Sequence, residues 1–142
     1  MNYRTFATEL ARQAGEMIRR NFALGMKKEW KANDTPITAT DRAVNQFVID
    51  AVAKSFPSHR VLAEEGDGGA AASSQVWVCD PVDGTIPFSH GIPCSVFSLA
   101  LVHDGVSILG VIYDPFLDRL FSAEKGKGAF LNGKPIAVSP QA

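Results

Sequence analysis

Residues 76–85 read Val-Trp-Val-Cys-Asp-Pro-Val-Asp-Gly-Thr, and this stretch decides the interpretation of the whole chain. An apolar run typical of a buried strand ends where two carboxylates, Asp80 and Asp83, appear three residues apart. Pro81 is expected to stiffen a turn between them, and Gly84 lets a ligand come close to the backbone. A short helix beginning at Thr85 would place free N–H groups, which bind anions, beside the carboxylates. Because Mg²⁺ prefers oxygen ligands and commonly also takes substrate phosphate, the stretch predicts metal-assisted phosphoryl chemistry.

Two other segments carry acidic residues in comparable positions. Glu64 and Glu65 follow a short apolar strand predicted at 60–63. Asp41 closes the run Thr-Ala-Thr-Asp at 38–41, which fits a helix-capping pattern. Taken alone, each segment has an ordinary interpretation. The Glu64-Glu65 pair is most often part of a solvated loop, and Asp41 is most often a helix cap. The Asp-x-x-Asp-Gly run at 80–84 is most often a turn. Spacing by itself does not bring the three segments together.

Upstream of these segments the periodicity is helical. Apolar residues recur at helical spacing over 3–24, with Gly25 expected to end this helix, and again over 38–56, where Phe56-Pro57 closes the second one. Between the two helices, the charged segment 27–31 is a candidate edge strand, and 33–36 reads as a turn.

Downstream, the pattern changes to strands. Residues 66–74 form a loop of small residues, and tight turns are predicted at Asp104-Gly105 and Asn132-Gly133. Strands are predicted at 60–63, 76–79, 94–103, 106–113, 118–123 and 135–138. Two helices followed by hairpin-connected strands indicate the α+β class, with the two N-terminal helices packed on a mostly antiparallel sheet.

Composition narrows the class of protein. The chain has 142 residues, 46% hydrophobic and 20% charged, as expected of one globular domain. The net charge of −1 shows no basic excess, so a nucleic-acid polymer is not an expected partner. No apolar run approaches the ~20 residues of a membrane span, and the N-terminus has no apolar signal core, so we expect a cytoplasmic protein without a membrane partner. Cys79 and Cys94 are too few for a disulfide scaffold and are expected to be buried thiols.

Two familiar carboxylate patterns are excluded by spacing. An EF-hand loop needs a Glu at its twelfth position, and that position counted from Asp80 is Gly91. Haloacid-dehalogenase phosphatases place their two aspartates two residues apart, whereas Asp80 and Asp83 are three apart. A phospho-aspartate mechanism is therefore disfavoured.

The hexapeptide Asp-Pro-Val-Asp-Gly-Thr at 80–85, with its Trp-bearing strand and the upstream Glu-Glu, closely resembles the inositol monophosphatase family. That family belongs to the Mg²⁺-dependent, lithium-sensitive sugar phosphatase superfamily, which includes fructose-1,6-bisphosphatase. Segments 38–41, 88–93 and 125–133 also fall in family order, so the resemblance covers essentially all 142 residues. It implies the N-terminal half of the sugar-phosphatase fold.

The resemblance also implies a set of metal ligands. Glu64, Asp80 and the backbone carbonyl of Val82 would bind a first Mg²⁺. Asp80 would bridge to a second ion held by Asp83, and a third, weaker ion would lie near Glu64. Two or three Mg²⁺ ions are thus expected, with lithium inhibiting by displacing one of them.

Further roles carried over from the family concern the phosphate and the water. Backbone N–H groups of Gly84 and Thr85 would hold the phosphate. Asp41 and the Thr85 hydroxyl would orient and activate a water for in-line attack on phosphorus, with no covalent enzyme intermediate. The expected catalytic residues are Asp41, Glu64 and Thr85, and the expected substrate-binding residues are Glu64, Val82, Asp83, Gly84 and Thr85.

Two departures from the family pattern stand out. Ile86-Pro87 replaces a pair that often contains Asn, which shortens the expected helix and removes a side-chain amide. The Trp-Asp motif of the family's second domain is missing, because neither Trp30 nor Trp77 is followed by Asp. Residues 1–142 are therefore interpreted as an N-terminal metal- and phosphate-binding domain, with the C-terminal substrate domain absent from this chain.

The predicted function is Mg²⁺-dependent hydrolysis of a small phosphorylated metabolite, with inositol monophosphate as the default substrate. Histidinol phosphate, 3′-phosphoadenosine 5′-phosphate and fructose bisphosphate are alternatives within the superfamily. A different alternative is a truncated or fragmentary chain that binds Mg²⁺ weakly and turns over little or nothing. An uncovered domain interface would expose an apolar patch and favour association, and a homodimer remains open for the full-length form.

Overall fold

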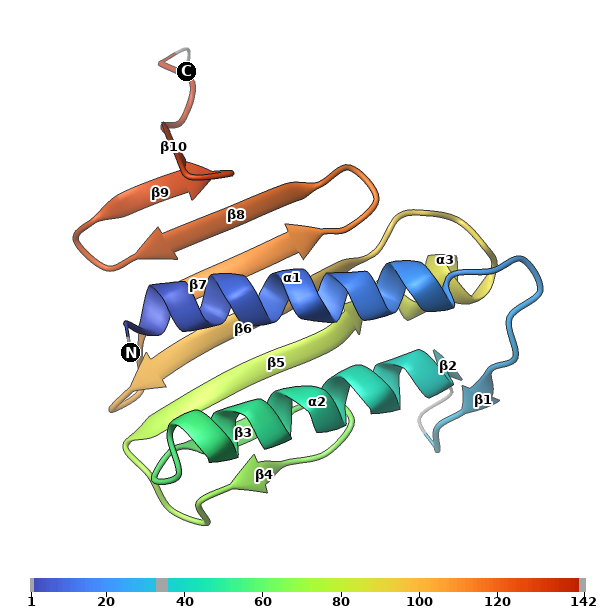
Figure 1. The fold of residues 1–142 in the computed structure, drawn as a ribbon, viewed down its shortest axis with the longest axis horizontal. Helices are drawn as coiled ribbons and strands as arrows, with labels where there is room; N and C mark the ends of the chain where they lie inside the picture. The colour runs from blue at the N-terminus through green and yellow to red at the C-terminus, as the bar shows by residue number, and fades with distance from the viewer. Residues whose placement is uncertain (1, 33–35, 141–142) are drawn as a thin grey trace.

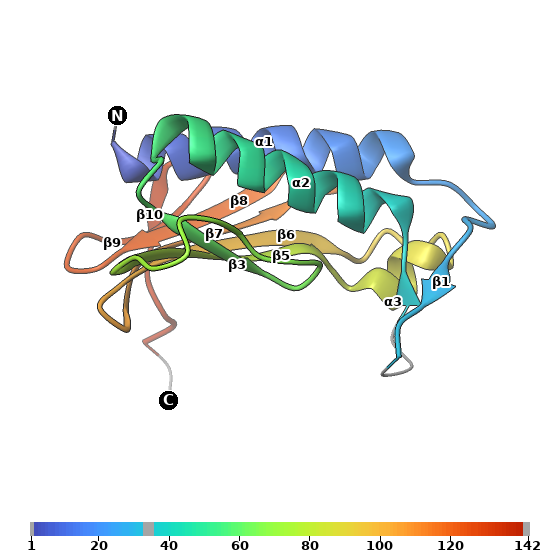
Figure 2. The same cartoon turned by 90° about the horizontal axis from the view of Figure 1, so that it is seen from below.

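The structure is a computed structural model that describes residues 2–32 and 36–140. Two helices, α1 (Tyr3–Asn21) and α2 (Ala39–Ser55), lie side by side on one face of an eight-stranded sheet (Figures 1 and 2). Between them, β1 (Glu29–Trp30) and β2 (Pro36–Ile37) pair as a separate two-stranded sheet. The predicted turn at 33–36 falls largely on residues 33–35, which lie outside the described residues.

The large sheet has the strand order β10-β9-β8-β7-β6-β5-β3-β4. Only β3 and β5 run parallel among these pairings, and all other neighbours are antiparallel. The strands are β3 (Arg60–Ala63), β4 (Gly68–Gly69), β5 (Gln75–Asp83), β6 (Val96–His103), β7 (Val106–Asp114), β8 (Arg119–Glu124), β9 (Gly128–Leu131) and β10 (Lys134–Ile136). This arrangement confirms the predicted α+β class, with both long helices packed on a mostly antiparallel sheet.

Helix α1 buries one apolar stripe against the sheet and ends earlier than predicted. The Asn2 side chain caps its start by accepting a hydrogen bond from the Arg4 N–H at 2.8 Å. Its C-cap is Phe22, three residues before the glycine that was expected to end it. Phe22 itself has extended backbone geometry, and its ring packs against Phe116, with ring centroids 4.9 Å apart.

Strand β5 differs most from its prediction. It continues to Asp83 rather than stopping at Cys79, so both aspartates belong to the strand and Pro81 lies within it, not in a turn. The register between β5 and β6 shifts between Asp80 and Asp83. Pro81 has no N–H for the ladder, and such a residue is accommodated at a bulge instead of ending the strand.

Smaller corrections concern the loops. Strand β6 begins at Val96, because the chain is still turning at Cys94, whose N–H donates to the Ile92 carbonyl at 2.8 Å. Cys94 is consequently exposed, so the prediction of two buried thiols holds only for Cys79. Two residues of the predicted loop 66–74 pair as β4, and the last strand lies slightly earlier than 135–138.

Both predicted tight turns are present. Asp104 and Gly105 have φ values of 47° and 77°, and Asn132 and Gly133 have values of 48° and 78°. Positive φ at both central residues is the geometry that two-residue hairpins require, which explains the Asp-Gly and Asn-Gly sequences.

The core lies between the helices and the facing side of the sheet. Trp77 is fully buried there, and its indole N–H donates to His59 Nδ1 at 3.0 Å. Burial lowers the pKa of His59, which keeps the imidazole neutral and able to accept this bond. This packing fixes the middle of β5, the strand that carries Asp80 and Asp83 near its end.

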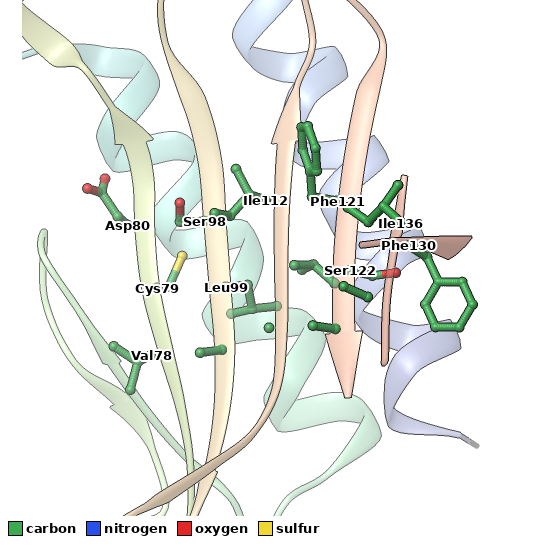
Figure 3. Close-up of a pocket in the computed structure, with 15 residues that line it drawn as sticks. Val78, Cys79, Asp80, Ser98, Leu99, Ile112, Phe121, Ser122, Phe130 and Ile136 are labelled. Carbon is green, nitrogen blue, oxygen red and sulfur yellow. The ribbon is translucent and has the colours of Figure 1, made fainter. Parts of the chain in front are cut away.

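The opposite face of the sheet is apolar and uncovered by any described residue. A row of mostly small residues crosses five strands in direct register, forming a trough of about 530 Å³ (Figure 3). Ile112 and Phe121 flank this trough, and 45% of the Ile112 surface is exposed. The row consists of Val78, Ala100, Gly110, Ala123 and Ala129. Residues after β10 leave the sheet on this side, away from the helices (Figure 2).

Candidate active site

The structure brings the predicted acidic segments together at one end of β3 and β5. A pocket of about 300 Å³ opens there, and Asp41, at the start of α2, stands behind Thr85 at its edge. The predicted site residues that line this pocket are Glu64, Asp80, Val82, Asp83, Gly84 and Thr85. The proximity that spacing could not establish is therefore provided by the fold.

Asp41 is held by a complete capping box. The Thr38 N–H donates to Asp41 Oδ2 at 2.9 Å, the Thr38 hydroxyl donates to the same oxygen, and the Asp41 N–H donates to Thr38 Oγ1 at 3.4 Å. Asp41 is only 1% exposed. Its other oxygen, Oδ1, accepts from the Thr85 hydroxyl at 2.9 Å. The cap is thus also a link between α2 and the start of α3 (Thr85–Ser89).

Thr85 connects this carboxylate with the backbone of β5. Its Oγ1 lies 2.9 Å from Asp41 Oδ1 and 2.9 Å from the Val82 carbonyl oxygen. A hydroxyl has one proton, and both neighbours only accept, so the two oxygens share a single donor. If the Val82 carbonyl were engaged elsewhere, the Thr85 proton would be directed to Asp41.

Gly84 is the one residue at the site that the backbone geometry restricts to glycine. Its φ is +96°, in the left-handed region, and a Cβ at this position would lie 2.8 Å from the Cys94 carbonyl oxygen. The absence of a side chain lets the chain pass from β5 directly into α3. The first N–H groups of that helix have no partner within it and remain available to a ligand.

Asp80 contrasts with Asp41, because one of its oxygens is left unsatisfied. Asp80 Oδ1 is buried and has no hydrogen-bond partner among the described residues. Burial, followed by repulsion from Glu64 and Asp83, raises the pKa of Asp80 to about 7. A carboxylate in this environment lacks a compensating positive charge.

The Glu64-Glu65 pair is bridged by a residue from the β1 segment. Lys31 Nζ lies 2.8 Å from Glu64 Oε1 and 2.5 Å from Glu65 Oε1. The Glu65 side chain is 4% exposed, whereas that of Glu64 is 45% exposed. Burial alone would lower the pKa of Lys31, but its bonds to the two glutamates raise it overall, so the ammonium stays charged.

Lys31 is the site residue that the sequence did not reveal. The sequence places it only within a short charged segment, and the single signal is its charge, which is complementary to an acidic pair that begins 33 residues downstream. The exposed side chain of Ile86 also lines the pocket, at the position of the departure from the family pattern. Pro87 is tolerated because it occupies the first turn of α3, where its missing N–H has no partner to lose.

The donor set fits a hard divalent cation. Within residues 2–32 and 36–140, no group of three or more His, Cys, Asp or Glu side chains is gathered closely enough to hold a metal ion. Even so, the unpartnered oxygen of Asp80, the neighbouring Asp83 and the partly exposed Glu64 provide oxygen ligands, the type that Mg²⁺ prefers. Lys31 currently supplies positive charge on the Glu64 side only.

A model of the inositol monophosphatase family matches residues 2–142 of the chain. The chain belongs to the inositol monophosphatase family. It is 40% identical over 139 residues to inositol monophosphatase 3 of Solanum lycopersicum, a match covering 95% of this chain and 52% of that relative. A histidinol-phosphatase of Chlorobaculum parvum is 37% identical over 134 residues, covering 94% and 52% respectively.

A solved structure gives the same answer for the fold. The IMPase of Thermotoga maritima superposes with a TM-score of 0.91 at 35% identity, covering 100% of this chain and 56% of that one. The inositol monophosphatase fold is thereby confirmed for these residues, and the named relatives are phosphatases. The chain spans about half the length of the inositol monophosphatase family members that it matches. No helix among the described residues is long and apolar enough to cross a membrane.

Proposed function

We propose that this chain provides the metal- and phosphate-binding domain of a Mg²⁺-dependent hydrolase of small phosphomonoesters. The observation that carries the proposal is the unpartnered oxygen of Asp80, which lies near Glu64 and Asp83 and beside a Thr85–Asp41 pair that is already formed. A divalent cation would relieve the repulsion among these carboxylates. A phosphate could then bind to the cation beside the Thr85 hydroxyl, which is already oriented by Asp41.

Four groups would hold the two or three Mg²⁺ ions, namely the carboxylates of Glu64, Asp80 and Asp83 and the Val82 carbonyl. Bound there, Mg²⁺ would neutralise phosphate charge and make a water more acidic. Engagement of the Val82 carbonyl leaves Asp41 as the acceptor of the Thr85 proton, so the lone pairs of Oγ1 are free to orient a water. The N–H groups of Gly84 and Thr85 would hold the phosphate oxygens.

The substrate we propose first is inositol monophosphate, because the chain matches several inositol monophosphatases closely. Histidinol phosphate is the second substrate that we propose, because a histidinol-phosphatase is also among the relatives of the chain. Pro87 stands where family members often carry an Asn, and the neighbouring Ile86, 59% exposed in the pocket, offers an apolar contact that would favour a substrate with an apolar edge at this point.

Two measurements on the same samples test the proposal. Mg²⁺ binding is followed by calorimetry, and phosphate release is followed with inositol monophosphate and with histidinol phosphate. We expect binding and Mg²⁺-dependent release, with Asp80→Asn reducing both by about 100-fold or more, as for removal of a metal ligand. Asp50→Asn, on the exposed face of α2, is the matched control and should change neither. Turnover that needs no divalent cation, or that survives in Asp80→Asn, would overturn the proposal.

A second candidate is a chain that binds Mg²⁺ but turns over little by itself. The absence of a group of three or more His, Cys, Asp or Glu side chains gathered closely enough to hold a metal, among the described residues, favours it. Mg²⁺ binding without phosphate release would support this candidate. Release of phosphate that depends on Mg²⁺ would overturn it.

A further inference from the structure

A polar pocket lies on the helix-covered side of the sheet, apart from the candidate active site. It has a volume of about 330 Å³ and is enclosed by the first half of α1 and by strands β8 and β9. Strand β8 is three strands away from β5 in the sheet order. Neighbouring strands are about 4.8 Å apart, so the pocket is roughly 14 Å or more from the β5 carboxylates.

Two arginines from α1 reach this pocket, and only one of them is neutralised. Arg12 pairs with Asp118 Oδ1 at 3.2 Å. The Arg4 guanidinium is placed over the Phe130 ring, 4.9 Å from its centroid, and makes no ion pair with any other residue in 2–32 and 36–140. The pocket therefore keeps one uncompensated, partly buried positive charge held in position by an aromatic face.

The strand side of the pocket contributes a hydroxyl without a partner. Ser122 is 8% exposed, lines the pocket and makes no side-chain hydrogen bond to the part of the chain described here. Its neighbour Asn132 is fully engaged, donating to the Asp118 carbonyl at 2.8 Å and accepting from the Leu120 N–H at 2.9 Å. The Ser122 hydroxyl opens onto the pocket and is not one of the buried side-chain atoms that lack a partner among the described residues, so it is free to donate to a ligand there.

We propose that this pocket binds a small phosphate-bearing anion at a second site, independent of the candidate active site. Arg4 would donate charge-assisted hydrogen bonds to the phosphate oxygens, and Ser122 would donate one from the opposite wall. The apolar side chains of Leu120 and Phe130 complete the pocket and leave room for a small organic body attached to the phosphate. No divalent cation is needed, because the protein itself supplies the positive charge.

The test is a titration followed by amide chemical shifts of the 142-residue chain, in EDTA and at constant ionic strength. The probes are inorganic phosphate and glycerol 2-phosphate. We expect saturable shifts at residues 4–8, 120–122 and 130–133. Arg4→Gln should weaken binding roughly tenfold and Ser122→Ala about threefold. Arg20→Gln removes the same charge from an exposed position on the same helix and should leave binding unchanged.

Each outcome decides the proposal. Saturation at the named amides supports it, and tighter binding of glycerol 2-phosphate than of inorganic phosphate would identify a metabolite rather than the free ion as the ligand. Shifts confined to residues 84–86 would assign all binding to the candidate active site and overturn it. Equal weakening by Arg20→Gln would show general charge attraction instead of a built pocket. The unliganded spectra report whether each variant is folded, and Ser122→Ala provides a second, conservative variant.

Discussion

Two aspartates border the same pocket in opposite states. Asp41, at the start of α2, is 1% exposed, and both of its oxygens accept hydrogen bonds from Thr38 or Thr85. Asp80, near the end of β5, has a buried oxygen without a partner and a pKa raised to about 7 (Figure 3). The fold therefore satisfies the Asp41 carboxylate with its own hydrogen bonds and leaves one oxygen of Asp80 without a partner among the described residues.

The largest effect should come from removing the completed carboxylate. Asp41→Ala leaves the Thr38 N–H and the Thr85 hydroxyl without their acceptor and deletes the capping box of α2. We expect a loss of about 3 kcal/mol in the free energy of unfolding, measured by urea denaturation without metal. Asp50→Ala, on the exposed face of the same helix, should lose about 0.5 kcal/mol or less. Similar losses for both variants would contradict a stabilising role for the hydrogen bonds that Asp41 accepts.

In metal-free buffer, Asp80→Asn should raise the free energy of unfolding, whereas Asp41→Ala lowers it. The pKa of Asp80 is about 7 in the folded chain, against an ordinary value near 3.9 when unfolded. The folded state therefore holds a proton that the unfolded state releases between about pH 4 and pH 7. Ionised Asp80 destabilises the folded chain. This loss of stability is absent below the pH window, grows as the pH rises through it, and is complete above it.

Asn carries no such charge, so Asp80→Asn should match the parent chain near pH 4 and exceed it at pH 8. After allowance for solvent screening of a partly exposed group, the difference at pH 8 is about 1–2 kcal/mol. Added Mg²⁺ should stabilise the parent chain and remove this advantage. A variant equally stable at both pH values would contradict the unsatisfied state of Asp80.

The same pair of aspartates shows what could be predicted from the sequence. The capping role of Asp41 follows from a four-residue pattern, because both partners of the capping box are local. The hairpin turn at Asp104-Gly105 was predictable for the same reason. Contacts across the chain were not: the Thr85–Asp41 bond spans 44 positions, and the Lys31–Glu64 pair spans 33.

The predicted turn at Pro81 was wrong for a different reason. Proline reads as a strand terminator, and the sequence therefore placed the aspartates in a turn. The structure absorbs it in a bulge, because β6 supplies register on both sides of the interruption. Neighbouring strands decide such a case, and their register cannot be read from the segment itself. The roles of the site residues remain predictions drawn from the family resemblance.

Lys31 places a covalently attached positive charge beside the acidic cluster, because its ammonium pairs with both Glu64 and Glu65. Lys31→Met should lower the free energy of unfolding by about 1–2 kcal/mol, because it leaves the buried Glu65 carboxylate unpaired. Lys127→Met breaks a Lys–Glu pair of the same length, 2.5 Å, at an exposed lysine and should lose about 0.5 kcal/mol or less. Thermal denaturation with and without Mg²⁺ measures both. Mg²⁺ should restore the Lys31 variant more than it stabilises the parent chain, and an identical response would argue against any link between Lys31 and the metal ligands.

The smallest effect extends the comparison to the two faces of the sheet. Asp41 belongs to the helix-covered side, whereas Asp80 lies at the rim of the open trough. Ile112→Asp, in the exposed flank of the trough, should change the free energy of unfolding by less than about 1 kcal/mol, while Val111→Asp, at the neighbouring buried position, should prevent folding. Because exposed apolar patches favour association, the parent chain should self-associate at high concentration and Ile112→Asp should do so less, as measured by light scattering. A parent chain that stays monomeric at every concentration would show that the exposed apolar face of the sheet does not drive self-association.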